Sequence, residues 1–303
     1  MFGRIAFAYG NQVIHKNIME VWVMKEVLDM KKNQICWSLV CNITYAQTVK
    51  WFDSSFMDLK LDLILPKHKE DRTKYPLLIW LCGGAFQSVD KEVWIPQWTE
   101  FARNGIIFAS VEYRTANEAP FPAALEDVKA AIRFLKANAD KYAIDTEKIY
   151  VAGESAGGCL ASLVGVYGKN SRYDVGNYLS YDSSVQGVID FYGVVDFINI
   201  EFEENSTMDL VKKNFFLDNN QKVWEEASAY KHVDEETPPF IILHGAQDEL
   251  VPIEQSDRMY AALKEHNIPV QYYVLKNCGH GADEFYQNDI LSIINKFVRN
   301  SQK

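Results

Sequence analysis

No apolar run in the sequence is long enough to cross a membrane. Its apolar segments, such as 77–82, fall well short of the roughly 20 residues that a membrane-spanning helix needs. Runs of lysine or arginine are also missing and the net charge is −10, which argues against a nucleic-acid binder. We therefore expect neither a membrane span nor a nucleic-acid partner, and favour a neutral or cationic small-molecule substrate.

Cysteine is scarce and irregularly placed. The five cysteines form no CxxC pair, and the sequence has no HExxH or other zinc pattern. An odd number of unevenly spaced cysteines is typical of buried free thiols in a reducing compartment. We therefore expect no metal, no cofactor and no disulfide framework.

A secretion signal is also not evident. The apolar part of 1–9 is too short for a signal peptide. Met30-Lys31-Lys32, before the apolar run 35–40, has the order of a signal that starts at an internal methionine, but this run is short as well. We interpret 35–40 as a strand and expect a cytoplasmic protein, with secretion from an internal start as the alternative.

What the sequence does contain is the composition of one large globular domain. Its 303 residues are 48% hydrophobic and 24% charged, which is ordinary for a chain that buries a large core. We expect a single domain over 1–303, in which 1–35 form an N-terminal extension of unassigned role. Nothing in the sequence indicates an oligomeric state.

Apolar runs of strand length alternate with helical patterns along most of the chain. This alternation predicts an α/β fold with a mostly parallel, eight-stranded sheet and helices on both faces. The expected strands are 35–45, 59–65, 77–82, 106–111, 149–152, 185–191, 240–244 and 270–275. The expected helices are 98–103, 123–139, 156–167, 255–266 and 284–298.

The segment Gly153-Glu154-Ser155-Ala156-Gly157 fits the pattern G-x-S-x-G. It follows an expected strand and opens an expected helix, which is the context that this pattern requires. Such a turn exposes the serine hydroxyl at the end of the sheet, and glycine is needed where the chain folds so tightly. We therefore predict that Ser155 is a nucleophile rather than part of an ordinary turn.

A nucleophilic serine needs a histidine base and an acid that orients the histidine. His280 follows the last expected strand and Asp248 follows the strand before it, so both belong to the sheet edge where ligands bind in such folds. The order Ser, Asp, His along the chain is the one that this architecture uses. Asp196 is the alternative acid, and His244, which has apolar neighbours, is expected to be structural.

The oxyanion of an acyl-transfer reaction needs two or more N–H donors. Ala156 supplies one at the start of its helix. Gly83 and Gly84 follow the strand 77–82, and glycine lets the backbone approach a substrate oxygen closely. These three residues are therefore the predicted oxyanion hole.

A pocket lined by aromatic residues is expected beside this site. Phe86 and Trp94 follow the oxyanion loop, and Phe216 belongs to 197–237, a segment too long for an ordinary connection. We predict that 197–237 is a small helical insertion over the active site. The charged residues of this insertion do not suit the broad apolar face of a lipase, so a preference for short acyl groups or a compact aromatic acid follows.

Together these residues resemble those of α/β-hydrolases of the carboxylesterase and lipase kind, near the hormone-sensitive-lipase-like and the feruloyl or acetyl (xylan) esterase branches. The resemblance implies an α/β-hydrolase fold and a structural pairing of Arg114 with Asp127 near the active-site loops. Cys82 stands where such esterases usually have the histidine of His-Gly-Gly. The matching segments are 81–86, 112–114, 119–124, Asp127, 152–158, 242–251 and 279–281.

The residues and the resemblance predict a serine carboxylesterase that acts through an acyl-enzyme on short-chain or compact aromatic esters. Acetyl or feruloyl esters of carbohydrates are the substrates that the resemblance implies. A peptidase or an arylformamidase on the same fold is one alternative, because both use the same groups on amides. A catalytically silent homologue that binds a ligand or a protein is another, and an intact serine, acid and base argue against it.

Overall fold

The computed structural model of the chain describes residues 8–9, 12–13, 27–30, 35–49, 55–67, 73–202, 204, 206–216 and 220–300. Its backbone contacts divide the chain into two units, Met1–Gln34 and Ile35–Lys303. In the first unit, β1 (Ala8–Tyr9) pairs antiparallel with β2 (Gln12–Val13). Most of the predicted N-terminal extension lies outside the described residues. The second unit holds the sheet and the candidate site.

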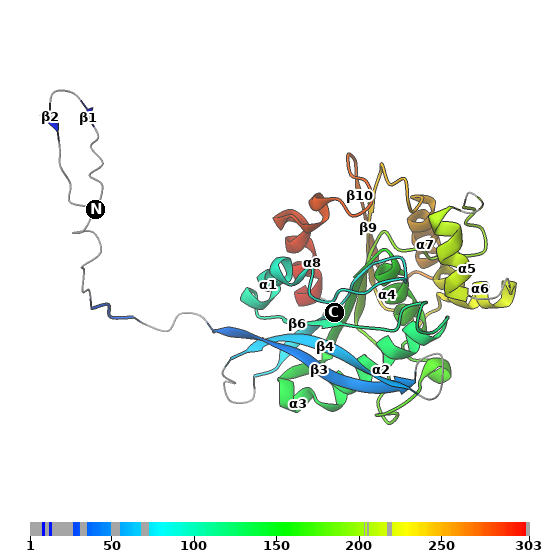
Figure 1. The fold of residues 1–303 in the computed structure, drawn as a ribbon, viewed down its shortest axis with the longest axis horizontal. Helices are drawn as coiled ribbons and strands as arrows, with labels where there is room; N and C mark the ends of the chain where they lie inside the picture. Colours follow the sequence, from blue (N-terminus) through cyan, green and yellow to red (C-terminus); the bar gives the residue numbers. More distant parts are fainter. Residues whose placement is uncertain are drawn as a thin grey trace. The chain divides into compact units, whose positions relative to one another are not determined.

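One eight-stranded sheet forms the centre of the second unit, as the alternation predicted (Figure 1). The strand order is β10-β9-β8-β7-β5-β6-β4-β3. Neighbours from β10 to β6 are parallel, and β4 pairs antiparallel with both β6 and β3. The strands are β3 (Trp37–Val49), β4 (Phe56–Pro66), β5 (Tyr75–Leu81), β6 (Ile107–Val111), β7 (Ile144–Glu154), β8 (Gly187–Phe191), β9 (Phe240–Gly245) and β10 (Val270–Leu275).

Helices cover both faces of this sheet (Figure 1). Successive residues of a strand point to opposite faces, and on β5 Ile79 belongs to one apolar cluster and Trp80 to the other. The cluster around Trp80 is covered by α1 (Ile95–Arg103) and α8 (Asn288–Asn300). The cluster around Ile79 is covered by α2 (Ala123–Ala137), α4 (Ala156–Tyr167) and α7 (Glu254–Glu265). Because the central strands of the sheet are buried on both faces, they form continuous apolar runs in the sequence.

The observed elements differ from the predicted ones mainly at their ends. The helix predicted over 123–139 is divided into α2 and a short α3 (Ala139–Tyr142). The helix predicted over 284–298 is divided into a 3-10 turn, η4 (Asp283–Tyr286), and α8, because Gln287 between them has extended backbone with ψ 158°. β7 begins earlier than predicted, where Ile144 pairs with Tyr75 of β5.

The segment 197–237 is helical, as predicted. It contains α5 (Thr207–Phe216), α6 (Gln221–Ala227) and the 3-10 turn η3 (Ala229–His232). Phe215 and Phe216 at the end of α5 are buried against the rest of the unit. Neither these helices nor the others in the described part of the chain have the length and apolarity needed to cross a membrane.

Candidate active site

Ser155 lies at the turn between β7 and α4. Its φ is 51°, in the left-handed region that residues with a side chain rarely adopt, and its N–H donates to the Phe191 carbonyl oxygen at 2.9 Å. A Cβ on Gly153 would come within 2.3 Å of the Gly157 oxygen, and one on Gly157 within 2.0 Å of the Leu81 oxygen. Glycine is therefore required on both sides of the serine, and the tight turn holds the hydroxyl at the end of the sheet.

His280 and Asp248 approach Ser155 from the loops that follow β10 and β9. Nε2 of His280 lies 3.0 Å from Oγ of Ser155, and Nδ1 of His280 lies 2.8 Å from Oδ2 of Asp248. The first distance is within reach of proton transfer, and the second contact favours the tautomer that carries its proton on Nδ1. The structure thus brings the three predicted residues into one hydrogen-bonded chain.

The side chain of Asp248 is fully buried. Its Oδ1 accepts hydrogen bonds from the N–H groups of Leu250 and Val251, at 2.9 and 2.8 Å. Burial by itself raises the pKa of Asp248, but the contacts with His244, His280 and the Val251 N–H outweigh burial and hold that pKa well below its usual range. The carboxylate is therefore charged at neutral pH and stabilises an imidazolium at His280.

Asp196, the alternative acid, has other partners. Its Oδ1 accepts from the N–H groups of Ile198 and Asn199 at 2.9 and 3.0 Å, and its Oδ2 lies 2.8 Å from Nη1 of Arg258. One oxygen of the Asp196 carboxylate therefore caps a turn, and the other forms an ion pair with Arg258. Asp248 is the acid that contacts His280 in the structure.

The loop after β5 runs beside the nucleophile. A Cβ on Gly83 would lie 3.3 Å from the Cβ of Ser155, and one on Gly84 would lie 2.2 Å from the Ser88 carbonyl oxygen. Gly84 also has a φ of +132°, which residues with a side chain rarely adopt. Ala156 is the first residue of α4, so its N–H has no acceptor within the helix. The predicted oxyanion loop thus lies beside the serine, but the Gly83 N–H donates to Oε1 of Glu154 at 3.4 Å. The other two predicted donors to the oxyanion are Gly84 and Ala156.

Glu154, which the G-x-S-x-G pattern leaves unspecified, was missed by sequence reasoning. It is 8% exposed, and it accepts hydrogen bonds from Nε1 of Trp94 at 2.6 Å and from the hydroxyls of Tyr192 and Tyr286 at 2.8 Å each. These partners lie 60, 38 and 132 residues away along the chain, so no local pattern could indicate them. The one available signal was a carboxylate inside a motif of small residues.

A narrow cavity of about 20 Å³ opens beside Ser155, which is room for one or two water-sized groups. Phe86 and Phe215 both line it, and their rings stack directly on each other with centres 3.9 Å apart. Among the described residues that line it, Lys212 is the one that carries a charge. The larger apolar residues that line it are Phe86, Val194, Phe197, Phe202, Val211 and Phe215.

The predicted pocket aromatics need correction. Phe86 lines the cavity beside Ser155, but Phe216 does not: consecutive residues of a helix point in different directions, and its neighbour Phe215 takes that place. Trp94 does not line the cavity either, because its indole N–H is bonded to the buried Glu154 carboxylate.

The pairing of Arg114 with Asp127 is confirmed. Nε and Nη2 of Arg114 each lie 2.8 Å from one carboxylate oxygen of Asp127, and the Arg114 N–H donates to the same carboxylate at 2.9 Å. Both side chains are buried. This bidentate pair joins the segment after β6 to the first turns of α2 and has a structural role.

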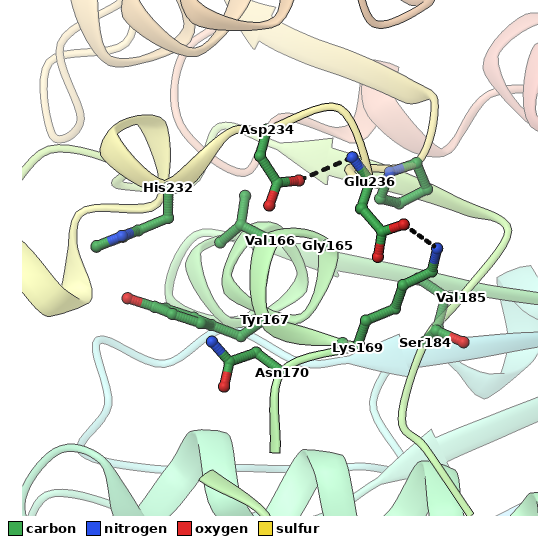
Figure 2. Close-up of a pocket in the computed structure, with 12 residues that line it drawn as sticks. Gly165, Val166, Tyr167, Lys169, Asn170, Ser184, Val185, His232, Asp234 and Glu236 are labelled. Atoms are coloured by element: carbon green, nitrogen blue, oxygen red, sulfur yellow. Dashed lines mark hydrogen bonds and ion pairs between the residues drawn. The ribbon is translucent and has the colours of Figure 1, made fainter. Parts of the chain in front are cut away.

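A larger cavity, of about 350 Å³, lies at the end of α4 opposite the nucleophile (Figure 2). Lys169 and Glu236 form an ion pair across one side of it, at 3.1 Å. A serine and a histidine also line it, but Ser184 bonds to Asp182, while His232 contacts a backbone carbonyl at 2.8 Å. The larger cavity therefore lacks the nucleophile–base contact that distinguishes the cavity beside Ser155.

The chain matches the family model BD-FAE over residues 61–263. Esterase LipC of Mycobacterium tuberculosis is 32% identical over 219 residues, which are 69% of this chain and 53% of LipC. The probable carboxylic ester hydrolase LipM of the same organism is 30% identical over 214 residues, 69% of this chain and 49% of LipM. The chain thus spans about half the length of these curated relatives.

A solved structure with the same fold is a truncated form of a carbohydrate esterase from gut microbiota. It superposes with a TM-score of 0.76 and 25% identity, covering 89% of this chain and 98% of its own. The predicted fold is therefore confirmed as an α/β-hydrolase fold with a mostly parallel sheet. The family match, the sheet topology and the relatives agree, and the chain belongs to the BD-FAE family of α/β-hydrolase esterases.

Proposed function

We propose that the chain is a serine carboxylesterase that removes short acyl groups, above all acetyl groups of carbohydrates, through an acyl-enzyme. The observation that carries the proposal is the hydrogen-bonded chain from Ser155 through His280 to Asp248, with contacts of 3.0 and 2.8 Å. The esterases LipC and LipM support an ester substrate. The carbohydrate esterase that shares the fold supports the acyl-carbohydrate class.

In the first half-reaction, Oγ of Ser155 attacks the ester carbonyl carbon while Nε2 of His280 takes the serine proton. Asp248 stabilises the imidazolium that forms. The negative charge on the carbonyl oxygen is stabilised by the backbone N–H groups of Ala156 and Gly84, while the Gly83 N–H is directed at Oε1 of Glu154 and holds the loop. His280 then gives the proton to the leaving alcohol, and the acyl group remains on Ser155.

In the second half-reaction, water takes the position of the departed alcohol. His280 accepts a proton from this water as it attacks the acyl-enzyme, and a second tetrahedral intermediate forms in the same oxyanion hole. Collapse of this intermediate returns the proton to Oγ of Ser155 and releases the acid. Every proton transfer in the cycle uses Nε2 of His280, which already lies 3.0 Å from Oγ.

The size of the acyl group follows from the cavity beside Ser155. The roughly 20 Å³ beside Ser155, lined in part by the stacked rings of Phe86 and Phe215, holds a methyl or ethyl group, and a feruloyl group is far larger. Of the two ester classes that the sequence predicted, this favours acetyl esters over feruloyl esters.

The test is a substrate panel with the Ser155→Ala variant as control. We expect 4-nitrophenyl acetate and acetylated xylo-oligosaccharides to be hydrolysed, and the alanine variant to lose activity by several powers of ten. A fluorophosphonate probe should label the wild type and not the variant. Faster cleavage of an aminoacyl anilide or of N-formylkynurenine would assign the chain to the peptidases or arylformamidases instead. A folded wild type that neither turns over an ester nor takes the probe would refute the proposal.

We also propose that the protein works in a reducing compartment, the cytoplasm. The support is that all five cysteines are free thiols, with Cys36 and Cys41 exposed and the other three buried. Alkylation of a cell extract under non-reducing conditions, followed by mass spectrometry, should modify both exposed thiols. A disulfide at either position would contradict this location.

A further inference from the structure

Glu154 is a buried carboxylate that is surrounded by hydrogen-bond donors. Its Oε1 faces Nε1 of Trp94 at 2.6 Å, the Gly83 N–H at 3.4 Å and, more distantly, Sγ of Cys82 at 3.8 Å. Its Oε2 accepts from the hydroxyls of Tyr192 and Tyr286 at 2.8 Å each. All five partners are donors, which is the environment that an ionised carboxylate satisfies and an amide or a protonated acid does not.

The donors themselves remain protonated. Burial, followed by the negative charge of Glu154, raises the pKa of the Cys82 thiol to about 12. Burial also raises the pKa of Tyr192 and of Tyr286 well above the usual range, with Glu154 adding to the effect. The two hydroxyls and the thiol therefore donate to Glu154 throughout the neutral pH range.

The five donors come from four segments of the chain: the loop after β5, the residue before α1, the residue after β8, and η4, which holds Tyr286. Cys82 and Gly83 belong to the oxyanion loop after β5, and Trp94 precedes α1. Tyr192 follows β8, and its ring packs on the His280 ring with centres 4.7 Å apart. Glu154 itself is the residue before the nucleophile, so one side chain joins the oxyanion loop, the histidine and the serine turn.

We propose that Glu154 is a positioning residue, whose carboxylate fixes the oxyanion loop through Oε1 and the packing partner of His280 through Oε2. The inference rests on the proposed esterase function. In this arrangement Glu154 also supports the loop at Cys82, the position where similar esterases have a histidine. Glu154 does not touch the reacting atoms; it acts through Gly83 and Tyr192.

The Glu154→Gln variant tests this role because it keeps the shape of the side chain. The amide retains one acceptor oxygen and turns the other into a donor, which then faces Trp94 or the two tyrosines. Oxyanion donors act mainly in the transition state, so we expect kcat to fall by about 10- to 100-fold while KM stays within about twofold. The inhibition constant of a short-chain trifluoromethyl ketone, which forms a tetrahedral adduct with serine, should rise by a similar factor.

A matched control is Glu226→Gln. Glu226 also accepts a hydrogen bond from a tyrosine, Tyr173 at 3.3 Å, but belongs to α6 away from the serine turn. This variant should keep the wild-type kcat. Rates are expressed per site that the fluorophosphonate probe labels, so partial unfolding does not imitate the effect.

Two further variants keep the carboxylate and remove one donor from each side of it. Trp94→Phe and Tyr192→Phe should each lower kcat about threefold to tenfold, the range that the net contribution of one ordinary hydrogen bond predicts. If Glu154→Gln does not fold, the kcat values of these two variants test the proposed role of Glu154 by themselves. The proposal is overturned if Glu154→Gln, or both donor variants, keep kcat per labelled site within about twofold of wild type. Wild-type activity with the ester panel is measured in parallel, and its absence would sink the proposed function instead.

Discussion

Nε2 of His244 lies 3.4 Å from Oδ2 of Asp248, the same oxygen that contacts Nδ1 of His280 at 2.8 Å. The acid of the candidate triad therefore lies between two histidines. His244 is fully buried at the end of β9, with Nε2 2.9 Å from the Val251 carbonyl oxygen and Nδ1 2.6 Å from Oγ of Ser256. These contacts join the strand end to the turn that carries Asp248.

We predict that His244→Phe lowers kcat for 4-nitrophenyl acetate by about tenfold. The ring keeps its approximate volume, but both nitrogens are lost, so the turn at Asp248 is less well held and His280 is less well oriented. The measurement is steady-state kinetics, normalised to fluorophosphonate labelling. His266→Gln serves as the control because His266 is exposed at the end of α7. A kcat equal to that of the control would mean that His244 only fills space.

The two candidate acids are separated by matched substitutions. Asp248→Asn should lower kcat by roughly 10²–10⁴, because an asparagine favours the wrong histidine tautomer. Asp196→Asn should leave kcat within about threefold and act on stability, since it weakens a turn cap and the ion pair with Arg258. Kinetics and urea unfolding of both variants check this. The opposite ranking of the two kcat values would transfer the acid role to Asp196.

Acyl-chain preference should respond to the volume of the cavity beside Ser155. We predict that Val211→Ala raises kcat/KM for 4-nitrophenyl butyrate and hexanoate relative to the acetate, because Val211 lines the cavity and loses two methyl groups. The change in ratio is expected to be about tenfold, as for one or two methylenes in an apolar pocket. Val233→Ala removes the same atoms from a buried site outside the cavity and should leave the ratio unchanged. An unchanged ratio in Val211→Ala would show that the acyl group binds elsewhere.

Most of the fold and the serine turn could be predicted from the sequence because their signals are local. A strand buried on both faces forms an apolar run, and β9, which is buried along its whole length, begins at Phe240, where the pattern of 240–244 placed it. G-x-S-x-G likewise carries its own geometry, since Gly153 and Gly157 are required by contacts within the turn and with the adjacent β5. The order of the motifs along the chain then indicated Asp248 and His280.

The parts that could not be predicted depend on packing between distant segments. Trp94 follows the oxyanion loop in sequence, which suggested a pocket residue, but its N–H partner is Glu154, 60 residues away. On α5 the choice between Phe215 and Phe216 depends on how the helix is rotated against the sheet, and a sequence with aromatics at both positions does not specify this. The link between His244 and Asp248 was equally hidden, because a buried histidine at a strand end is typical of a structural residue.

Asp190 provides a test of the core beneath the serine turn. It is fully buried on β8, where Oδ2 accepts from the Ser162 hydroxyl at 2.9 Å and Oδ1 from the Gly193 N–H at 2.9 Å. Burial raises the pKa of Asp190 from 3.8 to about 6, and the two hydrogen bonds offset only part of this. An acid whose pKa is raised on folding binds more protons in the folded state, so its contribution to stability falls as pH rises from about 4 to about 6.

Asp190→Asn should therefore be more stable than the wild type above pH 6 by roughly 3 kcal/mol, and the difference should shrink toward zero near pH 4. The asparagine can keep both hydrogen bonds, because its oxygen accepts from Gly193 while its amide donates to the Ser162 hydroxyl, which is free to rotate. The free energies of urea unfolding of both proteins at pH 4.5, 6 and 8 measure the effect. Asp289→Asn, at an exposed position on α8, should show no such pH dependence. If the difference in unfolding free energy between Asp190→Asn and the wild type stays constant from pH 4.5 to 8, the pKa of Asp190 is not raised by folding.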